Sequence, residues 1–307
     1  MEMSLNILPK ELLTLIIMNF FNPLSKIMTR FVSKNWKEIT KDNEKNRKSG
    51  ISFVAYFIGL KLTGNVKNII CELAASEGSL SILEWARSNG CKWNANVCIN
   101  AAKNGHLEVI KWARKNGCEW NESTCAYAAL NDHLEVLKWV RENGCKWNSS
   151  TCSFAAENGN LEVIKWARKN GCRWDETTCA RAAENDHLDV LKWVRENGCK
   201  WDKRTCSYAA WNGHLEVLKW AHENGCKWNT DVCNHAAGDG HLEVLKWAHE
   251  NGCEWNIWTC VYAARNGHLE VLIWARQNGC EWDKKECISQ SRVNKHNNIV
   301  EWLENND

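Results

Sequence analysis

The segment ESTCAYAALNDHLEVLKWVRENGCKWN, residues 122–148, decides the fold, because close copies of it fill most of the chain. Its NGC phrase recurs every 27 residues, with the cysteine running from Cys91 to Cys280. A second cysteine ladder with the same spacing runs from Cys71 to Cys287, so all 17 cysteines belong to the repeat. A fixed period of this size indicates a solenoid built from one supersecondary unit.

Each copy of the segment predicts a helix, a turn and a second helix. Residues 123–130 are a short Ala-rich helix, and Asn131-Asp132, which is Asn-Gly in four other copies, is a turn signal. The text HLEVLKWVRENG then places Leu and Val at helical spacing, and Gly144 supplies the left-handed residue that ends the helix. We count nine units: 68–94, 95–121, 122–148, 149–175, 176–202, 203–229, 230–256, 257–283 and 284–307.

Charge and hydropathy narrow the class of protein. The net charge is +2, without the strong basic excess that is typical of nucleic-acid binders. The start of the chain lacks a basic signal-peptide region, and the apolar runs Leu12–Phe21 and Ile51–Leu60 are about half of the ~20 residues that span a bilayer. We therefore expect an intracellular protein that binds neither membrane nor nucleic acid, with its cysteines as thiols.

The cysteines do not have the spacing of a chemical site. Structural zinc sites use closely paired ligands, whereas this chain has Cys-x6-Cys and no CxxC, and Asn160 replaces the His that recurs in most of the units. Equivalent cysteines of neighbouring units would lie about 8–10 Å apart, too far for a disulfide, although a contact between Cys118 and Cys125 across the loop stays open. No catalytic constellation or phosphate-binding loop occurs. We expect no enzyme activity, no metal and no cofactor.

The HLEVLKWVRENGCKWN half of the unit, with the pair Ala128-Ala129 before it, resembles an ankyrin repeat. This resemblance implies an all-α helix-turn-helix solenoid in which Cys125, Trp112 and Trp120 fill buried positions. The unit is about six residues shorter than the ~33 of an ankyrin repeat. The missing residues fall just after Asn121, where the family has its projecting finger, so we expect short, blunt fingers.

Positions that differ between units are candidates for recognising a partner. The most variable position follows the Ala-Ala pair and closes the first helix, which faces the concave groove in ankyrin arrays. Trp211 and Trp258 also stand outside the repeated tryptophan ladders, and protein interfaces favour Trp. Neutral variation at exposed sites would give the same pattern. The predicted target-binding residues are Lys103, Leu130, Glu157, Glu184, Trp211, Trp258 and Arg265.

Residues 4–40, SLNILPKELLTLIIMNFFNPLSKIMTRFVSKNWKEIT, do not follow the repeat. The phrase LPxELL, a turn with Pro and Leu, and the closing VSxxW resemble an F-box. The resemblance implies that this small helical module docks on the Skp-type linker subunit of a cullin ubiquitin ligase. The residues that it assigns to this contact are Leu8, Pro9, Glu11, Leu12, Ile16, Leu24, Val32 and Trp36. Residues 41–67 are expected to be a connector and an N-terminal cap for the repeats of 68–307.

The combined prediction is an all-α, ankyrin-like solenoid preceded by an F-box-like module. Its function would be that of a monomeric, non-enzymatic adaptor, the substrate receptor of a Skp-cullin-F-box-type ubiquitin ligase, whose repeats bind an unknown target protein. The alternative is an ankyrin-type scaffold without a ubiquitin role. The combination resembles proteins of large amoeba-infecting DNA viruses, which implies a place of action in the host cytoplasm.

Overall fold

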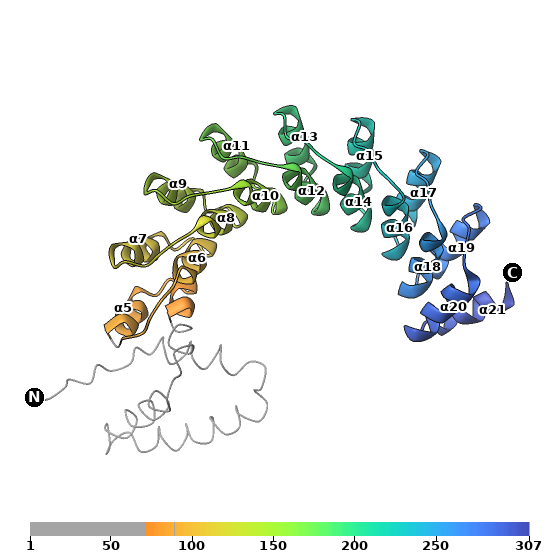
Figure 1. Ribbon diagram of the computed structural model, residues 1–307, viewed down its shortest axis with the longest axis horizontal. Coiled ribbons are helices and arrows are strands. Elements are labelled where there is room, and N and C mark those ends of the chain that lie inside the picture. The colour runs from red at the N-terminus through yellow and green to blue at the C-terminus, as the bar shows by residue number, and fades with distance from the viewer. Residues whose placement is uncertain (1–70, 89, 307) are drawn as a thin grey trace, which may run out of the picture. The chain divides into compact units, whose positions relative to one another are not determined.

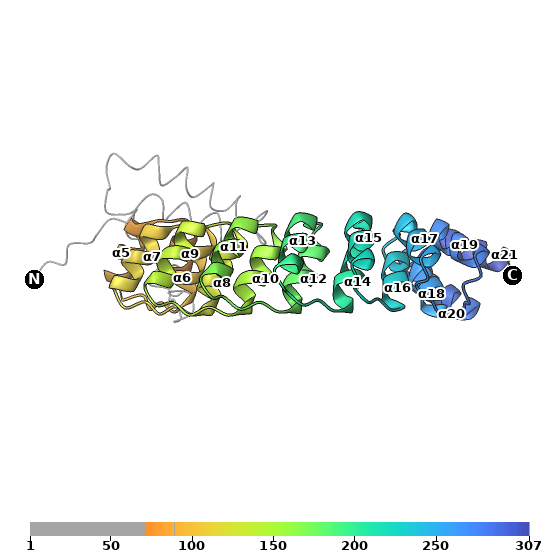
Figure 2. The ribbon, with the colours of Figure 1, turned by 90° about the horizontal axis from the view of Figure 1, so that it is seen from above.

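The computed structural model describes residues 71–88 and 90–306, and within these ranges all regular secondary structure is helical. Short helices follow one another in antiparallel pairs (Figures 1 and 2). The prediction of an all-α helical solenoid is confirmed for this part of the chain. The F-box-like segment 4–40 and the connector 41–67 lie outside the described residues.

The helices recur with the period of the sequence. The first helices of the pairs are α6 (Asn96–Lys103), α8 (Glu122–Leu130), α10 (Ser149–Glu157), α12 (Glu176–Glu184), α14 (Lys203–Trp211), α16 (Asp231–Gly238), α18 (Ile257–Asn266) and α20 (Lys284–Val293). The second helices are α5 (Leu80–Ser88), α7 (Leu107–Lys115), α9 (Leu134–Glu142), α11 (Leu161–Lys169), α13 (Leu188–Glu196), α15 (Leu215–Glu223), α17 (Leu242–Glu250), α19 (Leu269–Gln277) and α21 (Asn297–Asn305).

The chain divides into two compact units. Among the described residues the first comprises 71–124, except 89, with 135–145, and the second comprises 125–134 with 146–306. In the first unit α6 packs on α7. In the second unit the first helices α10 to α20 pack side by side, and each also packs on its own second helix. Figure 1 shows this row of first helices on the concave side of the second unit and α11, α13, α15 and α17 on its convex side.

The helix boundaries follow from local capping. Four first helices of the second unit begin after an Asn or Asp whose side chain accepts the N–H two residues ahead, as Asp175 does from Thr177 at 3.0 Å. The second helices α5 to α19 are each followed by a glycine with positive φ, for example Gly171 at +84° after α11. There the Cys172 N–H donates to the Ala167 carbonyl at 2.9 Å, as in a Schellman motif.

Small side chains make up the core between the helices. In the repeat at 149–175, Cys152, Ala155 and Ala156 of the first helix are fully buried, as are Ile164 and Ala167 of the second. Because these side chains are short, the helices can approach closely, and the larger Ile or Leu of the second helix fills the remaining space.

The two cysteines of one repeat meet inside it. Cys152 lies at hydrogen-bond distance from Cys172, and Cys179 from Cys199, so the contact joins thiols of the same repeat rather than thiols on either side of a loop. The thiol of Cys172 also donates to the Asn148 carbonyl at 3.4 Å. The same thiol-to-carbonyl bond recurs in Cys118–Asn94, Cys145–Asn121, Cys199–Asp175, Cys226–Asp202, Cys253–Asn229 and Cys280–Asn256.

All 17 cysteines are buried, free thiols. The hydrogen bond with Cys172, together with burial, raises the pKa of Cys152, and burial raises the pKa of Cys71 and of Cys287 to about 12. Thiols with a raised pKa stay protonated at neutral pH and are poor nucleophiles. In four other pairs the same thiol–thiol hydrogen bond lowers the pKa of the loop cysteine, namely Cys118, Cys226, Cys253 and Cys280. Among the described residues, no group of three or more His, Cys, Asp or Glu is placed to hold a metal ion.

The repeated tryptophans correct one expectation. Trp112 and Trp120 are half-buried, although the resemblance implies fully buried positions. Trp174 of the second unit shows the reason, because an indole is too large for a Leu or Val site and part of it stays at the surface. The guanidinium of Arg168 lies over its ring, 4.0 Å from the centroid, and the ring of Trp193 in the next repeat meets it edge-on at 6.0 Å.

A histidine and a glycine fit together at the turn between the paired helices. The Nε2 atom of His241 lies 2.9 Å from the Trp211 carbonyl of the preceding repeat. A Cβ atom on Gly213, where φ is +76°, would come within 2.6 Å of the His241 ring. The second glycine of this repeat, Gly225, has φ of +85° and nothing within 4 Å of that position.

We therefore expect Gly213→Ala to lower the stability of the protein more than Gly225→Ala. Both variants strain a left-handed residue by about 1–2 kcal/mol. Only the first also displaces a packed ring, which adds about 1–3 kcal/mol. The midpoints of thermal unfolding, followed by circular dichroism, measure the difference. Equal losses would contradict the proposed contact between His241 and Gly213.

His268 occupies the same position one repeat later, and burial lowers its pKa. When the pH falls below the ordinary histidine value of about 6.5, the unfolded chain takes up this proton before the folded chain does, so stability is lost from there down to the folded pKa. We expect His268→Asn to weaken this loss, because Asn does not titrate. Asn is tolerated at this position, since the Asn160 amide donates to the Ala129 and Leu130 carbonyls at 2.8 Å.

Unfolding midpoints of wild type and His268→Asn at about pH 7.5 and 5.5 test this expectation. The control is His268→Ala, which lacks both the proton and the hydrogen bond and should be less stable at both pH values. An identical pH dependence in wild type and His268→Asn would contradict it.

Candidate functional site

Three positions of every first helix lie on one exposed face. They stand two residues before the helix cysteine and two and five residues after it, which gives the spacing i, i+4, i+7 of a single helical face. We call this face the first-helix stripe. In the second unit its members are Ser150, Phe154 and Glu157 on α10, Thr177, Arg181 and Glu184 on α12, Arg204, Tyr208 and Trp211 on α14, Asp231, His235 and Gly238 on α16, Trp258, Tyr262 and Arg265 on α18, and Lys285, Ser289 and Arg292 on α20. All of them except Gly238 are at least partly exposed.

The stripe contains the residues that the sequence selects for target binding in this unit. Glu157, Glu184, Trp211 and Arg265 occupy its last position, and Trp258 occupies its first, at the opposite end of a helix. Leu130 closes α8 in the same way, and Lys103, which is exposed, closes α6 in the first unit.

Sequence reasoning missed the middle position of the stripe. It carries mostly aromatic side chains: Tyr127, Phe154, Arg181, Tyr208, His235 and Tyr262. The signal was present, because this position varies between repeats as much as the one after the Ala-Ala pair. Edge-to-face contacts join neighbours here, with the rings of Tyr127 and Phe154 5.5 Å apart.

On α12 the charges of the stripe neutralise one another. Arg181 forms ion pairs with Glu184 of its own helix at 2.8 Å and with Glu157 of α10 at 3.7 Å. Each of these side chains is about one third exposed. Such a pair contributes little to stability in water, but it fixes the three side chains relative to one another.

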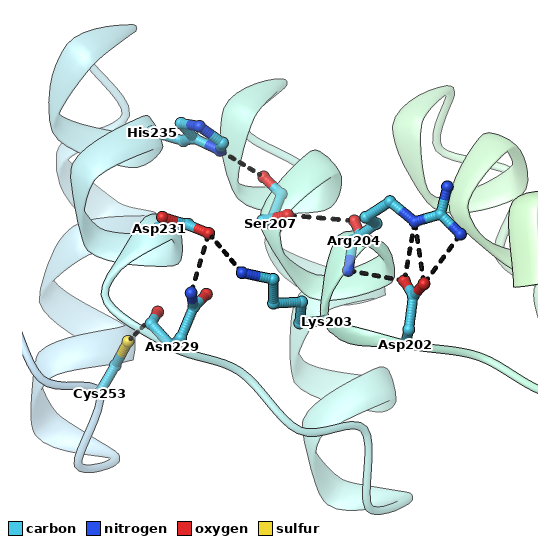
Figure 3. A network of polar contacts seen from close by, with 8 residues as sticks. All are labelled: Asp202, Lys203, Arg204, Ser207, Asn229, Asp231, His235 and Cys253. Atoms are coloured by element: carbon cyan, nitrogen blue, oxygen red, sulfur yellow. Dashed lines mark hydrogen bonds and ion pairs between the residues drawn. The ribbon is translucent and has the colours of Figure 1, made fainter.

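A second set of ion pairs lies at α14 and α16, and one of them joins the two helices (Figure 3). Asp202, which caps α14, binds Arg204 at 2.8 Å, and this hydrogen-bonded partner lowers the pKa of the carboxyl group. Lys203 reaches Asp231 of α16 at 3.3 Å. The Asn229 amide donates to the same carboxylate at 2.8 Å and is the main cause of the lowered pKa of Asp231. The cations on these two helices are therefore satisfied inside the protein.

An aromatic group lies next to these ion pairs. Trp211 is 47% exposed. Its ring centroid lies 5.1 Å from that of His235 and 6.4 Å from that of Tyr208. The Nδ1 atom of His235 is 3.3 Å from the Ser207 carbonyl, which fixes the imidazole (Figure 3). The indole of Trp211 thus rests on neighbours of known orientation while nearly half of it faces solvent.

The repeats match known families. One family model of ankyrin repeats, in three copies, matches residues 72–151, and another, in many copies, matches residues 179–222 and 233–276. The chain is an ankyrin-repeat protein. Among solved structures, the human ASB11 ankyrin repeat domain matches it at 18% identity with a TM-score of 0.42, over 51% of this chain and 84% of that one. No curated protein matches the chain.

Ankyrin repeats suggest a protein–protein interaction scaffold, and proteins of this family are typically binding scaffolds without enzyme activity. No helix in the described part of this ankyrin-repeat protein has both the length and the apolar character needed to cross a membrane. The stripe is the surface on which a rigid stack of this kind presents residues that differ from repeat to repeat.

Proposed function

We propose that this ankyrin-repeat protein is a non-enzymatic adaptor that holds a target protein against the first-helix stripe. The observation that carries the proposal is the exposed indole of Trp211, supported by Tyr208 and His235 on a row of rigid helices. Large aromatic side chains on rigid, partly buried supports supply most of the binding energy in many protein interfaces. The interior repeats with little change, whereas the stripe does not, which favours recognition as the role of the stripe.

The sequence before the repeats supports a role in ubiquitin transfer. The phrase from Leu8 to Leu13 and the closing phrase from Val32 to Trp36 resemble an F-box. In this proposal the segment binds the Skp-type subunit of a cullin ligase, and the repeats present the target to the other subunits. These residues lie outside the described part of the chain, so the support is the sequence pattern alone. The resemblance to viral proteins of this kind would place the adaptor in the host cytoplasm.

The second candidate is a scaffold without a ubiquitin role. It is favoured by the matched repeats, which account for target binding without the N-terminal segment. The two candidates make the same claim about the stripe and differ only in the partner of residues 4–40.

Quantitative capture experiments with the tagged, full-length protein in the cells that express it separate these candidates. We expect Trp211→Ala with Trp258→Ala to reduce target recovery about tenfold or more while the Skp-type subunit is retained. Leu8→Ala with Pro9→Ala should reduce recovery of the Skp-type subunit while the target is retained. The matched control is Glu223→Ala with Glu250→Ala, which changes exposed residues on second helices and should alter neither partner.

If the wild-type protein does not recover the Skp-type subunit, only the scaffold candidate remains. Unchanged recovery of every target by the double tryptophan variant would contradict the binding role of the stripe. Both mutated tryptophans are 45–47% exposed, so unfolding is not expected to cause the losses.

A further inference from the structure

The stripe changes character on its last two helices. On α18 it consists of Trp258, Tyr262 and Arg265, and on the adjacent α20 of Lys285, Ser289 and Arg292. Five of these six side chains are exposed, and Tyr262 is half-buried. We call this region the basic–aromatic surface.

The cations of this surface differ from those of the preceding helices. Arg181, Lys203 and Arg204 are each bound to a carboxylate of the protein itself. Within the described residues, by contrast, Arg265 and Lys285 form no ion pair, and none of the six stripe positions on α18 and α20 carries a carboxylate. The positive charge here is therefore available to a partner.

Arg292 is the intermediate case. It pairs with Glu304 of α21 at 2.6 Å, but both side chains are at least half exposed. A pair so exposed to water is weak, so a carboxylate of a partner can compete for the guanidinium.

An open pocket with both apolar and polar walls lies at the edge of the same surface. Trp258 is 45% exposed and Ile257 is 37% exposed, and they line an open pocket of about 400 Å³ together with Trp255, Asn256, Gly279 and Glu281. The ring of Trp258 leans on Tyr262 with centroids 5.8 Å apart, and its backbone N–H donates to the Asn256 side chain at 3.0 Å. The wall of the pocket is therefore held in place before any partner arrives, which lowers the entropic cost of binding.

We infer that the basic–aromatic surface binds an acidic segment of a protein partner through an aromatic or aliphatic anchor residue. The anchor occupies the pocket beside Trp258, and the carboxylates of the segment pair with Arg265 and Lys285. This inference rests on the proposed function, because it assigns a chemistry to one part of the target that the stripe would hold.

A nucleic-acid strand fits this surface less well, although aromatic and basic side chains also bind single strands. Glu281 lines the pocket and Glu304 lies against Arg292, so a continuous chain of phosphates would meet two carboxylates. A peptide can place its apolar anchor, rather than a charge, next to Glu281.

The test measures fluorescence polarisation of a labelled peptide, EEDLWDEE, with the full-length protein at low salt. Comparison probes are KKRLWRKK, which reverses the charge, EEDGSDEE, which lacks the anchor, and the DNA strand dT12. We expect EEDLWDEE to bind most tightly and to weaken with added salt, because its contacts include exposed charge pairs.

Variants then assign the contacts. Arg265→Glu with Lys285→Glu should weaken binding of EEDLWDEE about tenfold or more, and Trp258→Ala should do the same. The matched control is Lys200→Glu with Lys227→Glu, which makes the same charge change at two exposed lysines in loops and should leave the affinity within about twofold. Melting curves check that each variant is folded.

Three results would overturn the inference: no saturable binding of EEDLWDEE, equal weakening by the control pair, or tighter binding of dT12 or KKRLWRKK. Failure of the acidic peptide while the capture experiments still depend on Trp211 would reject this inference and keep the proposed function. If the peptide binds but recovery of the target does not depend on Trp211 or Trp258, the proposed target-binding stripe is rejected.

Discussion

The structure depends on the burial of two thiols in every repeat except the last, which has Cys287 alone. In the repeat at 149–175, Cys152 from the first helix and Cys172 from the loop after the second meet in the interior, and Cys172 donates to the carbonyl of Asn148, at the entrance to the first helix. The two ends of the repeat are thereby joined at one point. A cysteine suits this point because it is small, apolar and able to donate one weak hydrogen bond. A larger residue would separate the helices, and alanine would leave the carbonyl without this donor.

This closure lets the rest of the stack do without long fingers. The loop that leaves the repeat runs directly from Cys172 through Trp174 to Asp175, whose side chain caps the next first helix. The indole of Trp174, covered by Arg168, packs against Trp193 and so connects consecutive repeats at the surface. These residues all serve the stack, and they recur with little change. The stripe has no part in this closure and is therefore free to vary.

The sequence was sufficient to predict the helix pairs, because the period, the turn glycines and the apolar spacing are strictly local signals that agree with one another. It also singled out Trp211 and Trp258, which break the ladders and are exposed in the structure, and their role in binding stays a prediction. The prediction of buried positions for Trp112 and Trp120 was wrong, because matching them to the Leu and Val of an ankyrin repeat ignores the larger volume of an indole. The sequence did not pair Cys152 with Cys172, because that contact depends on how helices are placed in space. The support of Trp258 by Tyr262 was missed although it is an i, i+4 contact within one helix, which the spacing alone indicates.

The central claim is that the cysteines form the interior of the stack as buried, free thiols. Counting reactive thiols with Ellman's reagent tests this claim most directly. The account predicts that the native, metal-free protein reacts slowly, at a rate set by local opening, and that all 17 thiols react at once in denaturant without reductant. Rapid labelling of most thiols in the native protein, or fewer than 17 in the denatured one, would contradict it.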